Sequence, residues 1–250
     1  MTAVSGFEPH WTAPPNVRTF VTTRTGGVSA PPFESFNLAL HVGDDAEAVA
    51  ENRRRLREGL CLPAEPAWTA QVHGTRCTRA EPEGAADAEA DAAVVEGPGA
   101  VGVVLTADCL PVVLARADGA AAAVAHAGWR GLAAGVVDEA VRALGSPERI
   151  HAYLGPAIGP DAFEVGAEVR EAFLAGADED RRAFHARNDR WLANLYILAS
   201  QRLKRLGVPP HCISGGGFCT FSDGDRFFSH RRDGQTGRMA TLVWLEEGGA

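Results

Sequence analysis

The sequence predicts an α+β fold in which helices flank a β-sheet core. Runs of β-branched and other apolar residues are typical of strands, other segments carry apolar residues at helical spacing, and an Asp-Gly pair divides one long apolar stretch as a hairpin turn would. The chain has 250 residues, of which 46% are hydrophobic, and no segment has the composition of a linker. We therefore expect one domain spanning residues 1–250.

Composition argues against several functional classes. The formal net charge is -8 and the pI is about 5.5, whereas a dedicated nucleic-acid or anionic-membrane surface needs concentrated basic residues. The N-terminus lacks a basic start followed by an apolar run, and no apolar stretch approaches membrane-spanning length. The five cysteines form no disulfide framework. We expect a cytoplasmic protein with free or ligating thiols, no nucleic-acid or membrane partner, and no evident obligatory protein partner.

The N-terminal part predicts a strand followed by a helix. Residues 17–23 are rich in β-branched side chains and precede a Gly-Gly pair, which favours a strand ending in a turn. Residues 46–60 predict a helix with an arginine-rich polar surface, and either Asp44 or Asp45 is suited to cap its N-terminus. The residues between the two elements are expected to form a loop.

Two further strands are expected on either side of a loop. Residues 68–75 predict a strand that ends at the glycine of the sequence QVHGT, and residues 101–106 predict a β-branched strand. The acidic, alanine-rich residues 81–93 between them show no periodicity and are interpreted as a surface loop.

The second half of the chain predicts three helices. Residues 131–145 place six apolar side chains on one stripe and end at a glycine. These side chains are Leu132, Val136, Val137, Ala140, Val141 and Leu144. Residues 163–176 repeat apolar residues at intervals of four, and a longer helix is expected over residues 191–206. A strand starting at Ile150 lies between the first two helices, and a final apolar strand closes the chain.

A predicted hairpin brings a cysteine close to a histidine. If Asp118 and Gly119 form a two-residue turn, the numbers of paired residues sum to 237 and His126 faces Pro111. Cys109 then lies two residues further along on the same face, a diagonal neighbour of His126 at about 7–8 Å between backbones. Side chains at that separation can share one metal ion or one proton, whereas a three-residue loop would separate them.

His73 is the third candidate ligand, because its expected strand ends where QVHGT turns. Two imidazoles and one thiolate are good zinc ligands, and a set of three leaves a coordination position open, as in catalytic sites. We therefore interpret His73, Cys109 and His126 as a zinc site. The spacings of 36 and 17 residues match no short zinc motif, so burial of the three side chains in an ordinary core is the alternative.

Several sequence blocks occur in an order that resembles the YfiH-type family, whose members are also described as multicopper polyphenol oxidases, laccase-domain proteins and peptidoglycan editing factors. The blocks are TRTGGVS, SFNLALHVGDD, QVHGT, TADCLPVVL, HAGWRGL and FFSHRRDGQTGRMA. The resemblance covers about residues 22–241, and TADC with HAGWRG at this separation is its most specific part. It implies a layered, mixed and largely antiparallel β-sheet core flanked by helices, with zinc at His73, Cys109 and His126.

The resemblance implies purine nucleoside chemistry. The expected reactions are phosphorolysis of adenosine, inosine and methylthioadenosine to the free base and (methylthio)ribose 1-phosphate, and deamination of adenosine to inosine. Deamination adds water at C6 of adenine, which an open zinc site and a nearby proton carrier would assist. Cys109 and His126 are candidate catalytic residues, and Asp108 is the carboxylate nearest to them in sequence. Strict alternation along the strand would, however, turn Asp108 away from the face of Cys109.

Phosphorolysis also requires a site for phosphate. The block HAGWRGL offers Arg130 as a charged donor, and Gly128 and Gly131 permit close backbone approach. The helix that follows directs its N–H groups toward the same loop. The alternative is that Trp129 and Arg130 only pack on the edge of the sheet.

Further polar residues in the matching blocks are candidate nucleoside ligands, because bases and ribose hydroxyls require hydrogen-bonding partners. They are Arg24, Asn37, His41 and Gln71. Each of them would serve equally well as a turn or capping residue. Phe227 or Phe228 either stacks on a base or packs in the core, with core packing favoured.

Two pairs near the C-terminus have two interpretations each. Arg231 and Arg232 form either a second anion clamp or a solvated surface pair. Cys212 and Cys219 bracket the sequence ISGGGF and either bind another metal or are ordinary thiols, the latter being favoured because buried free thiols are common.

Other functions compete with nucleoside phosphorolysis. Copper is disfavoured relative to zinc, since the chain has eight histidines, no His-x-His pair and two methionines. Cys109 as nucleophile with His126 as base would suit a hydrolase or amidase acting on a cell-wall precursor, and such a dyad does not need His73. A zinc-stabilised binding protein would unfold without its metal, a dependence that a core of this size makes unnecessary.

Overall fold

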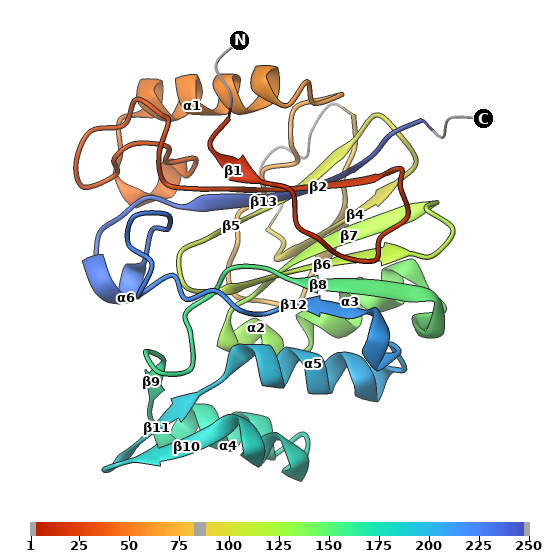
Figure 1. The fold of residues 1–250 in the computed structure, drawn as a ribbon, viewed down its shortest axis with the longest axis vertical. Coiled ribbons are helices and arrows are strands. Elements are labelled where there is room, and N and C mark those ends of the chain that lie inside the picture. Colours follow the sequence, from red (N-terminus) through yellow and green to blue (C-terminus); the bar gives the residue numbers. More distant parts are fainter. Residues whose placement is uncertain (1–3, 83–88, 248–250) are drawn as a thin grey trace.

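Two β-sheets packed face to face form the centre of the fold, and helices lie on both outer faces (Figure 1). The computed structural model describes residues 4–82 and 89–247. The first sheet has the strand order β1 (Gly6–Phe7), β2 (Val17–Thr22), β13 (Met239–Leu245), β5 (Val101–Thr106). Helix α1 (Ala46–Gly59) covers its outer face. The predicted strands at residues 17–23, at 101–106 and at the C-terminus are therefore confirmed.

The second sheet has six strands. Its order is β12 (Ile213–Gly215), β8 (Ile150–Leu154), β6 (Leu110–Arg116), β7 (Ala121–Ala127), β4 (Ala92–Glu96), β3 (Cys77–Arg79). The central pairs are antiparallel, and only the outermost pairs β12–β8 and β3–β4 are parallel. Helices α3 (Val136–Leu144) and α5 (Leu195–Leu206) cover the outer face. The sheet is thus mixed and largely antiparallel, and the α+β class is confirmed.

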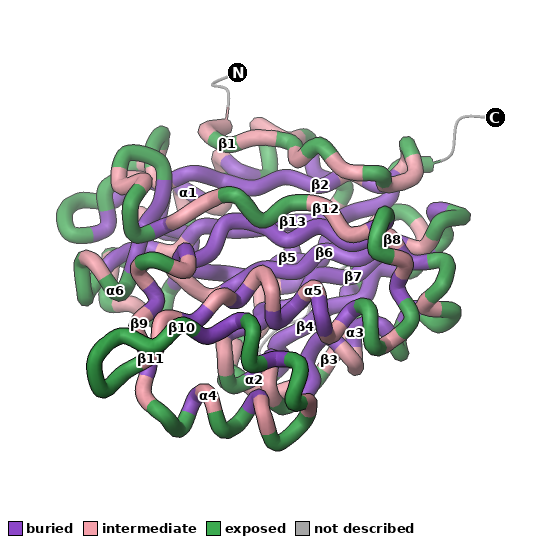
Figure 2. Tube along the Cα trace, turned by 60° about the horizontal axis from the view of Figure 1, so that its bottom comes forward, coloured by how far each residue is buried: buried purple, intermediate pink, exposed green. Residues whose placement is uncertain are grey.

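Burial on both faces explains why the central strands are continuous apolar runs rather than alternating ones. Every residue of β7 is buried. Ala123 and Ala125 pack toward the helices, whereas Ala122 and Val124 pack toward the first sheet. Figure 2 shows the central strands of both sheets, among them β5, β6, β7 and β13, in the colour of buried residues, whereas the outer strand β12 is intermediate to exposed.

A small third sheet projects beyond α5 (Figure 1). It has the strand order β10 (Phe184–Arg187), β11 (Arg190–Ala193), β9 (Glu164–Val165), with helix α4 (Ala167–Leu174) alongside. This sheet corrects two predicted helices, because both of the predicted ranges begin with a strand, at Glu164–Val165 and within Arg190–Ala193, and the helices start only afterwards. Trp191 pairs with Val165 across the sheet, and α5 starts only after Asn194, whose side chain accepts the Ile197 N–H.

The predicted helix at residues 131–145 is divided in two. Helix α2 (Trp129–Ala134) ends at Gly135, which has φ +115° and also begins α3. The left-handed conformation of this glycine interrupts the helix, although the apolar stripe stays buried throughout. The predicted helix at residues 46–60 is α1, and Asp45 caps it by accepting the N–H groups of Glu47 and Ala48.

Short helical segments connect the larger elements. They are η1 (Leu40–Val42), η2 (Pro147–Arg149), η3 (Asp178–Ala183), η4 (Pro210–Cys212) and α6 (His230–Asp233). No helix in the described part of the chain has both the length and the apolar character needed to cross a membrane.

Candidate metal centre and substrate cavity

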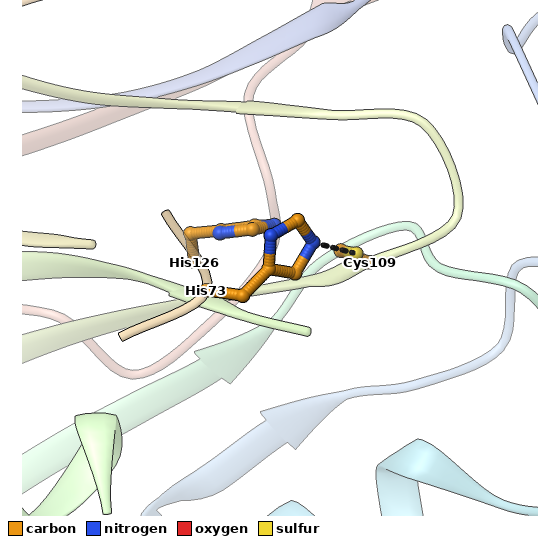
Figure 3. Close-up of side chains that lie close together, drawn as sticks. All are labelled: His73, Cys109 and His126. Atoms are coloured by element: carbon orange, nitrogen blue, oxygen red, sulfur yellow. Dashed lines mark hydrogen bonds between the residues drawn. The ribbon is translucent and has the colours of Figure 1, made fainter. Parts of the chain in front are cut away.

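Three side chains from separate segments meet at one end of the second sheet (Figure 3). Pro111 pairs with His126 in the hairpin, the register predicted for a turn at Asp118-Gly119, and Cys109 precedes β6 beside them. The possible ligand atoms of His73, Cys109 and His126 all lie within 4.8 Å of one another. The distance from Cys109 Sγ to His73 Nε2 is 3.8 Å. Two tetrahedral zinc ligands of these types would be about 3.6 Å apart, so the group fits a zinc ion.

The fully buried carboxylate of Asp91 orients His126. His126 Nδ1 donates to Asp91 Oδ1 at 2.8 Å. This bond fixes the tautomer, which leaves Nε2 as the atom available to a metal or to the Cys109 thiol. Asp91 was missed in the sequence because it stands at the end of an acidic, alanine-rich run. The signal that marks it is its position directly before the buried strand β4.

The same carboxylate holds the segment that carries His73. The backbone N–H groups of Val72, His73 and Gly74 donate to Asp91 at 3.2, 3.0 and 2.7 Å, and His73 has a left-handed φ of +60°. The predicted strand at residues 68–75 is therefore wrong, because its amide groups turn around a carboxylate instead of joining a sheet. Only Ala70 makes an isolated bridge, to Glu89.

The predicted surface loop at 81–93 is wrong from Asp91 onward, and residues 83–88 lie outside the described residues.

Cys109 and His126 stabilise each other as a thiolate and an imidazolium. Burial raises the pKa of the Cys109 thiol, but the charge and hydrogen bonds of His126 and His73 outweigh it and bring the pKa down to about 6. Burial lowers the pKa of His126, but the charges and hydrogen bonds of Cys109 and Asp91 bring it up to about 9. The sulfur is thus in its ligating form at neutral pH.

Two glycines after His126 allow the cluster to assemble. A Cβ atom on Gly128 would lie 2.8 Å from His73 Cδ2 and 3.0 Å from Cys109 Sγ. A Cβ atom on Gly131 would lie 2.8 Å from the carbonyl oxygen of Gly74. These glycines therefore make room for the ligand residues, whereas the sequence suggested that they admit phosphate.

The cluster opens into a cavity of about 350 Å³. Besides the cluster, its polar lining comprises His41, Gln71, Thr106, Arg130, His230 and Arg238. The described lining contains two guanidinium groups and no carboxylate. His41, Gln71 and Arg130 were predicted as substrate ligands, whereas His230 and Arg238 were missed because nothing in their local sequence links them to residues so far away in the chain.

The contacts of Gln71 and Arg130 differ. The side-chain amide of Gln71 pairs with both the N–H and the carbonyl oxygen of Leu105, so it extends the backbone pairing beside β5. Arg130 is exposed and its guanidinium lies 4.4 Å from the centre of the Trp129 ring. Helix α2 has six residues, and Arg130 is the one charged residue among them.

Arg24 and Asn37 do not line the cavity. Arg24 donates to the carbonyl oxygens of Glu34 and Gly224 and joins two loops. Asn37 is fully buried and donates to the Ala39 carbonyl, and its Oδ1 accepts the backbone N–H of Arg238 at 3.0 Å. Both contact sets match the turn-forming alternative considered for these residues.

The carboxylate of Asp108 makes its hydrogen bonds outside the cluster, but strand alternation is not the reason, because Asp108 and Cys109 lie in the turn before β6. Its two carboxylate oxygens accept the Thr220 hydroxyl at 2.6 Å and the Arg231 N–H at 2.7 Å. Asp108 has φ +89°, and it ties the turn before β6 to the C-terminal loop. These contacts favour a positioning role over a catalytic one.

The other candidate residues near the C-terminus make contacts that support the fold. Arg232 donates to the carbonyl oxygens of Thr220, Phe221 and Phe227. Arg231 donates to the Glu164 carbonyl. Phe227 and Phe228 are fully buried, which confirms core packing. Among the described residues, Cys212 and Cys219 belong to no group of three potential metal ligands, and all five cysteines are free thiols.

Comparisons with known proteins agree over nearly the full chain. The model of the family described as multi-copper polyphenol oxidoreductase laccase matches residues 18–246. A protein of Pseudomonas aeruginosa named purine nucleoside phosphorylase is 51% identical over 242 residues, covering 96% of this chain and 98% of the relative. The purine nucleoside phosphorylase YfiH of Escherichia coli is 49% identical over 238 residues, covering 95% and 97%.

Solved structures share the fold. A crystal structure of a Neisseria meningitidis protein superposes with a TM-score of 0.92 at 45% identity, covering 97% of this chain and all of the other. The YfiH protein of Bacillus licheniformis superposes with a TM-score of 0.87 at 31% identity, covering 92% and 93%. The chain therefore belongs to the YfiH-type family, whose sequence model carries the description multi-copper polyphenol oxidoreductase laccase.

Proposed function

We propose that this protein is a zinc-dependent purine nucleoside phosphorylase that also deaminates adenosine to inosine. The observation that carries the proposal is the opening of the His73, Cys109 and His126 cluster into a cavity with two guanidinium groups and no carboxylate among its described residues. Such a cavity suits an uncharged nucleoside together with a phosphate anion. Relatives about 50% identical are named purine nucleoside phosphorylases, and adenosine, inosine and methylthioadenosine are the proposed substrates.

The donor set favours zinc over copper. Two imidazoles and one thiolate suit zinc, the described cluster includes no further histidine, and no methionine is among the described residues that line the cavity. Zinc at this position would supply a Lewis acid to the cavity. The chain itself holds His126 and the His73 backbone through Asp91, and the thiolate of Cys109 through the neighbouring imidazoles.

In phosphorolysis, a phosphate oxygen forms a bond to C1′ of the ribose as the C1′–N9 bond breaks. The bonding electron pair leaves with the purine, and the proton lost by phosphate ends on the purine. Arg130 at the cavity wall would attract the phosphate, and His41 would supply an imidazole to the bound nucleoside. Gln71, which pairs with Leu105, forms part of the same cavity wall as Arg130 and His41.

In deamination, water adds at C6 of adenine and ammonia leaves, with a proton passing from the water to the departing nitrogen. No oxidant is needed. Because Asp108 does not face the cluster, the imidazoles of His41 and His230 are the proposed proton carriers.

The experiment is mass-spectrometric analysis of adenosine incubated with zinc-loaded protein, with and without phosphate. We expect adenine and ribose 1-phosphate only with phosphate, and inosine in both cases. Cys109→Ala should abolish all three products, whereas Cys61→Ala, which alters an exposed thiol outside this cavity, should retain them. Unchanged adenosine with zinc bound to the wild type would refute the proposal.

A cysteine hydrolase or amidase acting on a cell-wall precursor is the second candidate. The observation that favours it is the lowered pKa of Cys109 beside His126, which is typical of a nucleophilic thiol. The two functions differ in their need for metal and for His73. If the protein still converts its substrate after a chelator has removed zinc, or when it carries His73→Ala, the hydrolase is favoured.

A further inference from the structure

The guanidinium of Arg238 is half-buried in the cavity and has no acidic partner among the described residues. Its Nη1 donates to the carbonyl oxygens of Thr236 and Gly237 at 2.8 and 3.0 Å. Within the described residues, Nε and Nη2 make no hydrogen bond, and no carboxylate oxygen lies within 4.0 Å. These donors are therefore available to a ligand in the cavity that Arg238 lines.

The backbone of Arg238 is held by a buried side chain, and its Nη1 is held by two backbone carbonyl groups. Its backbone N–H donates to Oδ1 of the fully buried Asn37, and the Asn37 side chain is held in turn by Ala39 and Asp44. Such preorganisation lowers the entropic cost of binding. Asn37 is thus a positioning residue for Arg238.

Burial and the positive charges of Arg238, Arg53 and His126 lower the pKa of His41, so this residue adds a neutral imidazole to the cavity rather than a second cation. His41 and His230 line the same cavity, and His230 Nδ1 donates to the Gly234 carbonyl at 2.7 Å, which leaves Nε2 as an acceptor for the proton that hydrogen phosphate carries. Burial lowers the pKa of Arg238, and the charges of Cys109 and Asp108 offset this effect only in part. A partly desolvated cation with no partner is unfavourable, so an anion that reaches it is bound more strongly than at an exposed arginine.

We propose that Arg238, together with His230, forms the inner phosphate-binding subsite of the cavity. This assignment rests on the proposed phosphorylase function and identifies the group that holds the attacking phosphate. Arg130 has the outer role, because it is exposed and lies against Trp129. The planar fork of Arg238 suits two oxygens of a tetrahedral dianion.

Binding of inorganic phosphate to zinc-loaded protein without nucleoside tests this assignment by calorimetry. We expect Arg238→Gln to weaken phosphate binding at least about tenfold and Arg238→Lys to restore it only in part, since lysine keeps the charge but loses the fork. His230→Gln should weaken phosphate binding less than Arg238→Gln does. Because it alters the same subsite at a different residue, it tests the assignment even if the Arg238 variants fail to fold. Arg142→Gln alters an exposed arginine on α3 and should bind phosphate as the wild type does.

Kinetics separate this inference from the proposed function. We expect Arg238→Gln to raise the KM for phosphate while leaving the KM for nucleoside within about twofold. Normal phosphate binding in Arg238→Gln, or no phosphate binding by the wild type, would overturn the subsite. Phosphate binding that depends on Arg238 in a protein without phosphorolysis would support the subsite and refute the phosphorylase function.

Discussion

Asp91 and His126 form a buried carboxylate–imidazole pair with 2.8 Å between Oδ1 and Nδ1. The same carboxylate accepts three successive backbone N–H groups around His73. One side chain therefore holds two of the three cluster residues, although it lies in neither of their segments. The hydrogen bonds and the charge of His126 keep the pKa of Asp91 below its usual range in spite of burial.

Asp91→Asn is expected to weaken zinc binding by about 10–100-fold, because an amide cannot accept all four hydrogen bonds and no longer fixes the His126 tautomer. It should also cost on the order of 3 kcal/mol of unfolding free energy. Competition with a zinc chelator and urea denaturation measure the two effects. Asp161→Asn, at an exposed position, is the matched control. Wild-type zinc affinity in Asp91→Asn would contradict this role.

The reactivity of Cys109 should depend on pH with a midpoint near 6 in the metal-free protein. Its pKa is brought down to about 6, so the thiolate fraction rises as the pH increases through that value and is nearly complete at pH 7.5. The rate of iodoacetamide alkylation at Cys109, followed by peptide mass spectrometry, reports this fraction. His126→Gln should move the midpoint upward. An unchanged midpoint in that variant would disprove the coupling between the two side chains.

Gly128→Ala should disrupt the cluster without unfolding the chain. The added methyl group would lie 2.8 Å from His73 and 3.0 Å from Cys109, so one of these side chains must move, at a cost of about 1–3 kcal/mol. We expect zinc affinity to fall at least about tenfold. Gly217→Ala, whose added Cβ has no atom within 4 Å, is the control. If both variants bind zinc equally well, the close approach at Gly128 is unimportant.

The hairpin geometry could be predicted from the sequence because it is local. A turn at Asp118-Gly119 fixes the pairing of Pro111 with His126 through the chain between them. The conformation around His73 could not be predicted, since it depends on Asp91, 18 residues away in sequence. In isolation residues 68–75 resemble a strand, and the acidic run before β4 resembles a surface loop.

Other differences have either a local or a long-range origin. The helix predicted over residues 131–145 is divided, because the left-handed backbone of Gly135 separates α2 from α3. Trp191 joins β11 because Val165 offers a pairing partner. Arg238 reaches the cavity only because β13 lies between β2 and β5 in the first sheet. Contacts between distant segments decide the positions of Trp191 and Arg238, and local patterns do not encode them.

Removal of zinc should leave the fold intact. The three largest hydrophobic clusters are built from sheets and helices and do not include the metal-binding side chains. Chelator-treated protein should keep its far-ultraviolet circular dichroism, with a Tm lowered only by the lost binding free energy. Global unfolding on chelation would instead indicate a zinc-stabilised binding protein.

The central claim is that the His73, Cys109 and His126 cluster supports nucleoside phosphorolysis through one bound zinc ion. The most direct measurement is titration of metal-free protein with zinc while ribose 1-phosphate formation from adenosine and phosphate is followed. The rate should rise in proportion to added zinc and reach its plateau at one ion per chain. A rate that is already maximal without zinc, or absent at full occupancy, would contradict the claim.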